Sequence, residues 1–455
     1  MTVAVKKFNM VACSVRDVEV VSGGDGSLTM HMYTFEKEWG SERGETGLRG
    51  EATGVEDSGA EENIRDDDVG GRHVASTNAH GGRCDGDGKP LLVLCIHGAG
   101  YSGLTFAPLA EALVGTCGVS GGGTGGGGSR GGGRGTCGVW GEGPGMVVVA
   151  PDLRGHGGTR AADEMDLSIE TLVGDVEALY EVDLRDRYGD VVLVGWSMGA
   201  AVAIKAASKA GHALASRVVG LVAIDVVEGT AMEALKSMAS ILAMRPKGFD
   251  SIEEAVAWAV SSGTTRRRES AEISVPGMLL AAGEDFAGGV GLSMGVGATT
   301  AGSTTKGSET MGPPPPIPRY PTIREDGGEE QEKPCEKRDT GKRERGGKTS
   351  YKYVWRVALE RTERFWTGWF QGLSRAFLDV RAPKLLLLAG HDRLDKTLTI
   401  AQMQGKFQMA VVPDSGHAIH EDQPRLVADK ICAFLERHLG NAARDQIVGR
   451  TFVRE

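Results

Sequence analysis

Several patterns that mark particular classes of protein are missing from the sequence. No apolar run reaches the ~18 residues that a membrane-spanning helix needs, and the N-terminus has no apolar segment followed by a small-residue cleavage site. The seven cysteines are an odd number and lack the spacing of metal ligands. There is also no Walker loop and no G-x-G-x-x-G with a following acidic residue. We therefore expect a soluble protein of a reducing compartment such as the cytoplasm, without a membrane segment, a metal or a cofactor.

An excess of positive charge is absent as well. The chain has 61 acidic and 51 basic residues, which gives a formal net charge of −10. An acidic chain is poorly suited to bind nucleic acid through its overall field, so we expect no nucleic-acid partner. A basic run at 342–348 could act as a nuclear signal, although such runs are more often solvated parts of disordered loops.

Three segments contain too few apolar residues to build a core: 36–88, 115–145 and 280–350. Glycine makes up 17 of the 31 residues in the second segment, and the third combines Gly, Ser, Thr and Pro with mixed charges. Such segments bury too little apolar surface to offset the conformational entropy that ordering removes. We expect them to be disordered inserts in a single domain that spans 1–455. The remaining residues, about 300, suffice for one large core.

Outside these segments, apolar runs alternate with segments of helical spacing. Most of the runs are apolar throughout, as in strands that helices cover on both faces. The expected strands are 91–96, 146–150, 191–194, 218–224, 384–389 and 407–412, and the expected helices are 107–113, 168–180, 198–210, 251–260 and 425–439. This alternation predicts an α/β fold with a mostly parallel central sheet flanked by helices. The segment at about 226–380 is too long for one crossover, so we expect it to form a helical lid that contains the third insert.

The strongest motif is G-x-S-x-G, which runs from Gly195 to Gly199 and follows an expected strand directly. A helix is expected to begin at Met198, so the serine lies on a sharp turn between strand and helix. Glycines on both sides of such a turn avoid clashes of a Cβ atom with the neighbouring strand and helix. This context predicts an α/β-hydrolase fold with Ser197 as the nucleophile.

Two further motifs fit the same chemistry. Residues 97–100 (HGAG) end the expected strand 91–96, and a backbone N–H there, at Ala99, could stabilise an oxyanion together with that of Met198. His97 itself is expected to pack within its loop. Residues 414–417 (DSGH) follow the last strand, so His417 can reach back to the nucleophile as the general base. His420 is a weaker alternative three residues further on.

The acid of the expected triad is ambiguous. Asp392 follows the next-to-last strand, where most α/β-hydrolases carry their acid, and Asp225 follows the strand before it. Both residues keep the order Ser, Asp, His along the chain. Position in the sheet alone slightly favours Asp392, and Asp225 remains the alternative.

Longer stretches carry a more specific pattern. Residues 224–232 (IDVVEGTAM) and 385–409 are the most distinctive, and they are joined by 17–20, 245–247, parts of 355–374, and 416–422. Together these stretches resemble the protein phosphatase methylesterase family, and the resemblance covers most of the chain outside the inserts.

The resemblance implies an enzyme that removes the methyl ester from the C-terminal leucine of the protein phosphatase 2A catalytic subunit. It also implies Ser197 as nucleophile, His417 as base and Asp225, rather than Asp392, as acid. The methylated C-terminal tail of the phosphatase would be the partner. A methyl ester offers little binding energy of its own, so the affinity should come from a protein surface around the site, most naturally on the lid.

Two residues depart from the usual nucleophile motif of that family, which has His before the serine and a second Gly after the motif. Trp196 and Ala200 occupy these positions here, while both glycines of the turn remain. Two other functions stay open from the sequence. One is a small-molecule carboxylesterase of the same fold, and the other is an inert phosphatase-binding module, which the intact triad candidates make the least favoured.

Overall fold

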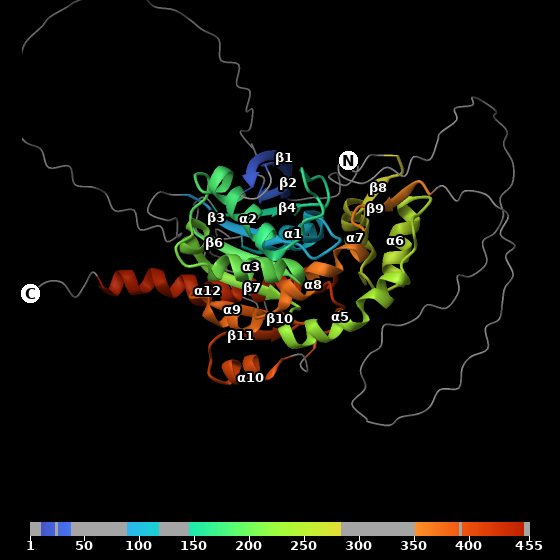
Figure 1. Cartoon of the computed structure of the whole chain (residues 1–455). Coiled ribbons are helices and arrows are strands. Elements are labelled where there is room, and N and C mark those ends of the chain that lie inside the picture. Colours follow the sequence, from blue (N-terminus) through green and yellow to red (C-terminus); the bar gives the residue numbers. More distant parts are fainter. Residues whose placement is uncertain are drawn as a thin grey trace, which may run out of the picture.

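The computed structural model describes residues 11–22, 26–37, 89–117, 145–283, 351–390 and 394–449 (Figure 1). The three expected inserts fall outside these residues except at their edges. There the flanking elements continue into the expected insert, as Glu36 and Lys37 do in the first case. The predicted disorder of the inserts therefore concerns residues outside the described part of the chain.

A mixed sheet forms the centre of the described structure. It has nine strands there, in the order β1-β2-β4-β3-β6-β7-β10-β11, with β5 beside β2. The strands are β1 (Val11–Ser22), β2 (Gly26–Lys37), β3 (Leu91–Ile96), β4 (Met146–Pro151), β5 (Arg160–Ala161), β6 (Val191–Trp196), β7 (Val218–Ile224), β10 (Lys384–Leu388) and β11 (Gln408–Val411). The pairs that β2 makes with β1, β4 and β5 are antiparallel, and the other pairs are parallel. The mostly parallel sheet predicted from the sequence is confirmed.

The central strands are almost entirely apolar because both of their faces are covered. Every residue of β3, β4, β6 and β10 is buried. In β3, Leu92 and Leu94 belong to one core cluster, whereas Val93 and Cys95 belong to the cluster on the opposite face. Burial on both faces disfavours polar residues at these positions, which is why the strands could be located from the sequence. Lys384, the first residue of β10, is an exception, and its Nζ donates a hydrogen bond to the carbonyl of Val380 at 2.6 Å.

The antiparallel hairpin of β1 and β2 was not predicted as such. The sequence marks 17–20 only through the family resemblance, and it does not predict β2. β1 lies at the edge of the sheet and alternates exposed with partly buried residues, so its apolar pattern is weaker than that of the central strands. Its register with β2 runs from Val11 opposite Lys37 to Ser22 opposite Gly26.

Helices cover both faces of the sheet (Figure 1). One face packs against α2 (Ile169–Leu179), α3 (Met198–Ser208), α8 (Glu363–Phe370), α9 (Leu373–Asp379) and α10 (Lys396–Met403). The other face packs against α1 (Ala107–Cys117), α11 (Ile419–Asp422) and α12 (Pro424–Gly449). The short helix α4 (Ala213–Arg217) leads into β7, and the helical turns η2 (Gly103–Phe106) and η3 (Tyr180–Leu184) adjoin α1 and α2.

The segment expected to form a lid, at about 226–380, divides between two cores. Buried side chains of α8 and α9, such as Trp369 and Phe377, belong to the core of the sheet. A separate small core contains Phe249, Val256 and Met278. The elements that precede α8 are α5 (Glu228–Ala243), α6 (Ile252–Ser261), α7 (Arg268–Ser274), η4 (Val275–Met278), β8 (Leu279–Ala281), β9 (Tyr353–Trp355) and η5 (Leu359–Thr362). We call α6, α7, η4, β8 and β9 the cap.

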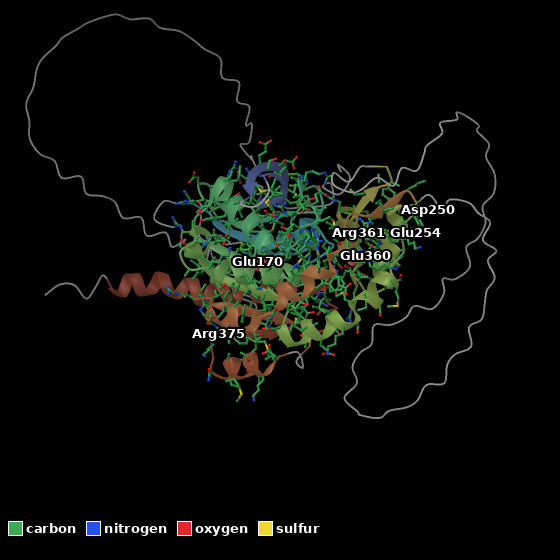
Figure 2. All side chains as sticks on the ribbon, in the orientation of Figure 1. Glu170, Asp250, Glu254, Glu360, Arg361 and Arg375 are labelled. Carbon is green, nitrogen blue, oxygen red and sulfur yellow. The ribbon has the colours of Figure 1, made fainter. Side chains whose placement is uncertain are left out.

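Charged side chains cover the outside of the helices around the sheet and of the cap. Glu170 on α2, Arg375 on α9 and Glu254 on α6 are exposed examples (Figure 2). Glu254 also supports the start of its helix, because it accepts a hydrogen bond from the N–H of Asp250 at 2.8 Å while its own N–H donates to Ser251 Oγ. Among the described residues, no helix is both long and apolar enough to cross a membrane.

Candidate active site

Ser197 lies at the point where β6 ends and α3 begins. Its backbone has φ 53° and ψ −120°, in a region that residues other than glycine rarely adopt. Such a conformation costs on the order of 1–3 kcal/mol and persists only where the surrounding structure enforces it. Here the neighbouring strand helps, because the N–H of Ser197 donates a hydrogen bond to the carbonyl of Ile224 at 3.1 Å. The sharp turn predicted from G-x-S-x-G is present.

The two glycines of the motif have a steric reason. A Cβ atom on Gly195 would overlap with the backbone of Ala200, at the start of α3. One on Gly199 would overlap with the carbonyl oxygens of Ile96 and His97, at the end of β3. Helix α3 therefore approaches the sheet more closely than any side chain would permit.

His417 follows β11 and lies beside this turn. Its imidazole ring is 5.3 Å from the ring of Trp196, measured between centroids, and Trp196 directly precedes Ser197. The side chain of His417 remains 54% exposed, so a substrate can approach it from solvent. Sequence position had singled out His417 from ten histidines, and the structure places it next to the nucleophile candidate.

Asp225 is the carboxylate that meets His417. Its Oδ2 lies 2.8 Å from His417 Nδ1, and its Oδ1 accepts a hydrogen bond from the N–H of Ala389 at 3.0 Å. The carboxylate is fully buried. A positive φ of 47° at Asp225, directly after β7, turns the chain there. The carboxylate is thereby held on both oxygens, which leaves the other imidazole nitrogen, Nε2, for proton transfer.

The two alternatives from the sequence have different outcomes. Asp392 lies outside the described residues, so the structure gives it no position. His420 is fully buried, and its Nε2 lies 2.8 Å from the hydroxyl oxygen of Thr105. Burial lowers the pKa of His420 to about 3. His420 is therefore a neutral packing residue and does not contact Asp225.

The oxyanion-hole candidates lie on the loop after β3 and at the start of α3. Within the described residues, neither the N–H of Ala99 nor that of Met198 donates a hydrogen bond, so both remain available to an oxyanion. The next amide along, Gly100 N–H, is occupied because it donates to His156 Nε2 at 2.9 Å. The hydrogen bond of Gly100 thus fixes the loop after β3 directly beside the N–H of Ala99.

Two buried histidines support this loop. His97 Nε2 accepts from the N–H of Leu153 at 2.9 Å, and its Nδ1 lies 2.8 Å from the carbonyl of Gly98. His156 repeats the arrangement with Gly100 and the carbonyl of Arg154. Burial lowers the pKa of His97 to about 4 and that of His156 well below its usual value, so both rings are neutral and carry their proton on Nδ1. The prediction that His97 packs within its loop is confirmed.

The loop that carries His417 is anchored by the acidic residues after it. Asp422 accepts hydrogen bonds from the N–H of Gly416 at 2.6 Å and from that of Arg266, which precedes α7, at 2.7 Å. Glu421 is buried and accepts from the hydroxyls of Thr105 and Thr265. The sequence had marked 416–422 through the family resemblance but gave these carboxylates no role. Contacts between residues far apart in the chain could not have been found from spacing.

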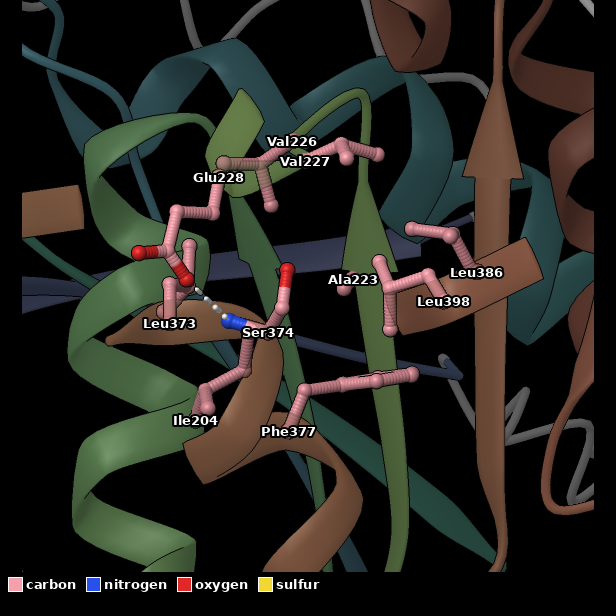
Figure 3. A pocket seen from close by; sticks show the side chains of 10 residues that line it. All are labelled: Ile204, Ala223, Val226, Val227, Glu228, Leu373, Ser374, Phe377, Leu386 and Leu398. Carbon is pink, nitrogen blue, oxygen red and sulfur yellow. Dashed lines mark hydrogen bonds between the residues drawn. The ribbon is translucent and has the colours of Figure 1, made fainter. Parts of the chain in front are cut away.

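A small cavity lies beneath the loop that follows Asp225 (Figure 3). Its volume is about 10 Å³, which leaves room for one water molecule at most. Its walls are Ile204, Ala223, Val226, Val227, Glu228, Leu373, Ser374, Phe377, Leu386 and Leu398. Glu228 accepts from the N–H of Ser374 at 2.9 Å and thereby caps α9 (Figure 3). Neither Ser197 nor His417 lines this cavity, so it supports the acid loop and is not the reaction site.

No cluster of three or more His, Cys, Asp or Glu side chains that could hold a metal ion occurs among the described residues.

Known proteins share both the fold and much of the sequence. The chain matches the alpha/beta hydrolase family over residues 93–430. Protein phosphatase methylesterase 1 of Bos taurus is 39% identical over 353 residues, which cover 78% of this chain and 78% of that protein. The probable protein phosphatase methylesterase 1 of Caenorhabditis elegans is 35% identical over 353 residues, or 78% of this chain and 71% of the relative. The Cryptococcus neoformans var. neoformans relative is 34% identical over 376 residues, or 81% of this chain and 67% of its own. The chain therefore belongs to the protein phosphatase methylesterase family of α/β-hydrolases and is a serine hydrolase of the esterase type.

Proposed function

We propose that this esterase hydrolyses the methyl ester on the C-terminal leucine of the protein phosphatase 2A catalytic subunit, with Ser197, His417 and Asp225 as its catalytic triad. The observation that carries the proposal is the 2.8 Å contact between Asp225 and His417 beside a strained nucleophile turn. The names of the relatives support the substrate, since relatives from a mammal, a nematode and a fungus are named protein phosphatase methylesterase 1, the nematode protein as a probable one.

The chemistry follows from the roles of the three side chains. Ser197 Oγ attacks the ester carbonyl, and His417 takes its proton on Nε2 while Asp225 holds the ring through Nδ1. The N–H groups of Ala99 and Met198 stabilise the negative charge on the tetrahedral oxygen. His417 then returns the proton to the leaving methoxide, and methanol departs.

Water completes the cycle. It attacks the acyl group on Ser197, with His417 again as base, and releases the free carboxylate of the leucine. The burial of Asp225 and the exposure of His417 suit these two reaction steps. The acid keeps a fixed position inside the protein, whereas the base stays accessible to the end of a polypeptide from solvent.

The decisive experiment is the release of methyl groups from the methylated phosphatase 2A catalytic subunit. Ser197→Ala and Asp225→Asn should each lower kcat by on the order of 10⁴-fold, because the first removes the nucleophile and the second disturbs the tautomer and orientation of His417. Asp392→Asn serves as the matched control, since it changes the rival carboxylate, and should remain active.

Other outcomes would change the assignment. Loss of activity in Asp392→Asn with retention in Asp225→Asn would move the acid to the later strand. Rapid turnover of short acyl esters without any release of methyl from the phosphatase would instead favour a small-molecule carboxylesterase. Stable binding of the phosphatase with no labelling of Ser197 by a fluorophosphonate would indicate an inert binding module.

A further inference from the structure

Trp196 connects the nucleophile turn to the loop of the general base. It is the last residue of β6 and is 1% exposed. Its indole Nε1–H donates a hydrogen bond to the backbone carbonyl of His417 at 2.8 Å, across 221 positions of sequence. Since Trp196 is covalently joined to Ser197, this single bond links the backbone of the base to the residue before the nucleophile.

The indole ring fills the space between two loops of the site. It lies 4.5 Å from the ring of Tyr101, edge to face, on the oxyanion loop. On the other side it lies 5.3 Å from the ring of His417 and 4.8 Å from that of His420. Aromatic rings attract one another at these separations and angles, so the indole is held from both sides.

Gly98 provides the room that the indole needs. A Cβ atom there would come within 2.9 Å of two carbons of the Trp196 ring and within 3.4 Å of Ser197 Cβ. The glycine next to the oxyanion donor Ala99 thus has a steric role that the sequence alone did not give it.

Asp422 anchors the neighbouring Gly416, but few contacts hold His417 itself. Its side chain is half exposed, and the described structure anchors it through Asp225 at Nδ1 and through its backbone carbonyl at Trp196. Proton transfer requires the donor and acceptor to lie within hydrogen-bond reach of one another. A displacement of about 1 Å at such a site can cost roughly 100-fold in rate.

We propose that Trp196 is a positioning residue for ester hydrolysis. Its indole N–H holds the backbone of His417, and with it the imidazole, at the distance from Ser197 that proton transfer requires. This inference rests on the proposed roles of Ser197 and His417, but it does not depend on which ester is the natural substrate.

Trp196→Phe is the first test, because it keeps a ring in the buried site and removes the N–H donor. Trp369→Phe is the matched control. Trp369, on α8, is also buried, at 3% exposure, and its Nε1–H also donates to a backbone carbonyl, that of Leu167 at 2.7 Å, which belongs neither to the turn of Ser197 nor to the loop of His417. The two variants lose the same kind of hydrogen bond, so they should lose similar stability.

Activity should separate the two variants. With a short aryl ester as substrate, Trp196→Phe should lower kcat by roughly 10- to 100-fold at a KM within about twofold of the unmodified protein. The rate at which a fluorophosphonate labels Ser197 should fall by a similar factor, while the final labelling stays at one group per chain. Trp369→Phe should leave kcat and the labelling rate unchanged.

If Trp196→Phe does not fold, benzothienylalanine placed at position 196 tests the same point, because it has the shape of tryptophan with sulfur in place of N–H. A kcat and a labelling rate within twofold of those of the Trp369 control would overturn the inference. Because the readouts are aryl ester hydrolysis and Ser197 labelling, a failure to demethylate the phosphatase would defeat the proposed substrate and leave this test intact.

Discussion

Backbone strain in the described residues is concentrated around the candidate site. Among all described residues, only three other than glycine have a positive φ: Ser197, Asp225 and Asp414, at 53°, 47° and 56°. The first two are the proposed nucleophile and acid, and the third lies three residues before His417. Strained residues cluster at sites where the chain must aim a side chain, because the surrounding structure has to compensate for them. Each turn here follows a strand of the parallel sheet.

Glycine at position 199 gives a sharp prediction at the residue scale. Gly199→Ala places a Cβ against backbone carbonyls of β3, which cannot move aside as a side chain can, so the protein should fail to fold or lose most of its stability. Gly174→Ala is the control, since a Cβ there meets nothing within 4 Å in the middle of α2. It should raise the free energy of unfolding by roughly 0.5–1 kcal/mol. Urea unfolding of both variants checks this, and a stable Gly199→Ala protein would contradict it.

The buried pair of Arg154 and Asp175 gives a second residue-scale prediction. Both side chains are fully buried, and two hydrogen bonds of 2.8 Å join them. Asp175→Leu leaves a buried guanidinium without its carboxylate, so it should lower the free energy of unfolding by about 3–5 kcal/mol. Glu181→Gln breaks the exposed ion pair with Arg185 and should leave the free energy of unfolding almost unchanged, because solvent screens this pair. Equal effects in the two variants would contradict the argument.

At the scale of elements, the cap is tied to the loop of the general base. Thr265 and the N–H of Arg266 reach Glu421 and Asp422, which follow His417. Arg356, just after β9, donates to the carbonyls of Gly157 and Thr159 at 3.1 and 3.0 Å. The cap therefore contacts the two loops on which the base and the oxyanion donors depend, although its own core is separate.

The buried carboxyl of Glu421 makes this connection dependent on pH. Burial raises its pKa from 4.5 to about 7. Between these values the folded protein keeps a proton that the unfolded chain releases, so the contribution of Glu421 to stability falls as the pH rises from about 4.5 to about 7. At lower pH both states are protonated, and at higher pH the full cost of the buried charge applies.

Glu421→Gln should remove this dependence. Relative to the unmodified protein, the free energy of unfolding of the variant should increase by on the order of 2–3 kcal/mol between pH 5 and pH 8. Glu360→Gln, at an exposed position on η5 (Figure 2), should show the same change in the free energy of unfolding between pH 5 and pH 8 as the unmodified protein. Denaturant unfolding at the two pH values measures both, and parallel curves for all three proteins would refute the assignment.

At the scale of the whole molecule, the third expected insert begins and ends at one hairpin. Strands β8 and β9 pair antiparallel, and the N–H of Ala282 donates to the carbonyl of Lys352 at 2.7 Å. The two ends of the intervening chain are therefore already adjacent. Residues on either side of it complete the small core of the cap.

Replacing 284–350 by a four-residue loop should leave the fold and the hydrolysis of a short ester unchanged. The shorter loop has a smaller closure entropy, which should stabilise the hairpin by on the order of 2 kcal/mol. Thermal unfolding and aryl ester turnover test this, with the full chain as reference. Loss of both would show that the replaced segment contributes to the fold. Loss of phosphatase demethylation alone would show that the replaced segment is needed to bind the phosphatase.

The central strands were predictable because their physical requirement is local. β3 was expected at 91–96 and spans Leu91–Ile96, since a strand covered on both faces must be apolar throughout. Helix α5 lies in the segment expected to be a helical lid, but the sequence did not predict its bounds, and it has no fully buried residue. Its partly buried residues, Met232 and Leu235 among them, only pack against the edge of the sheet core. A helix of this kind leaves a weak apolar pattern, so its position depends on tertiary contacts.

By itself, the sequence determined the class of fold, the nucleophile turn and the candidates for base and oxyanion donors. All of these depend on neighbours along the chain: apolar runs, glycines beside Ser197, and a histidine after the last strand. Only the tertiary structure decided which side chains from different strands contact one another at the site. β7 and β10 are parallel neighbours and end at the same edge, so an aspartate after either strand could have reached His417. Sheet position had slightly favoured Asp392 and the family resemblance Asp225, and the described structure shows the carboxylate of Asp225 on His417 Nδ1. The hydrogen bond from Trp196 to His417 and the neutral state of His97 and His156 also arise only on folding, because burial and contacts between distant residues cause them.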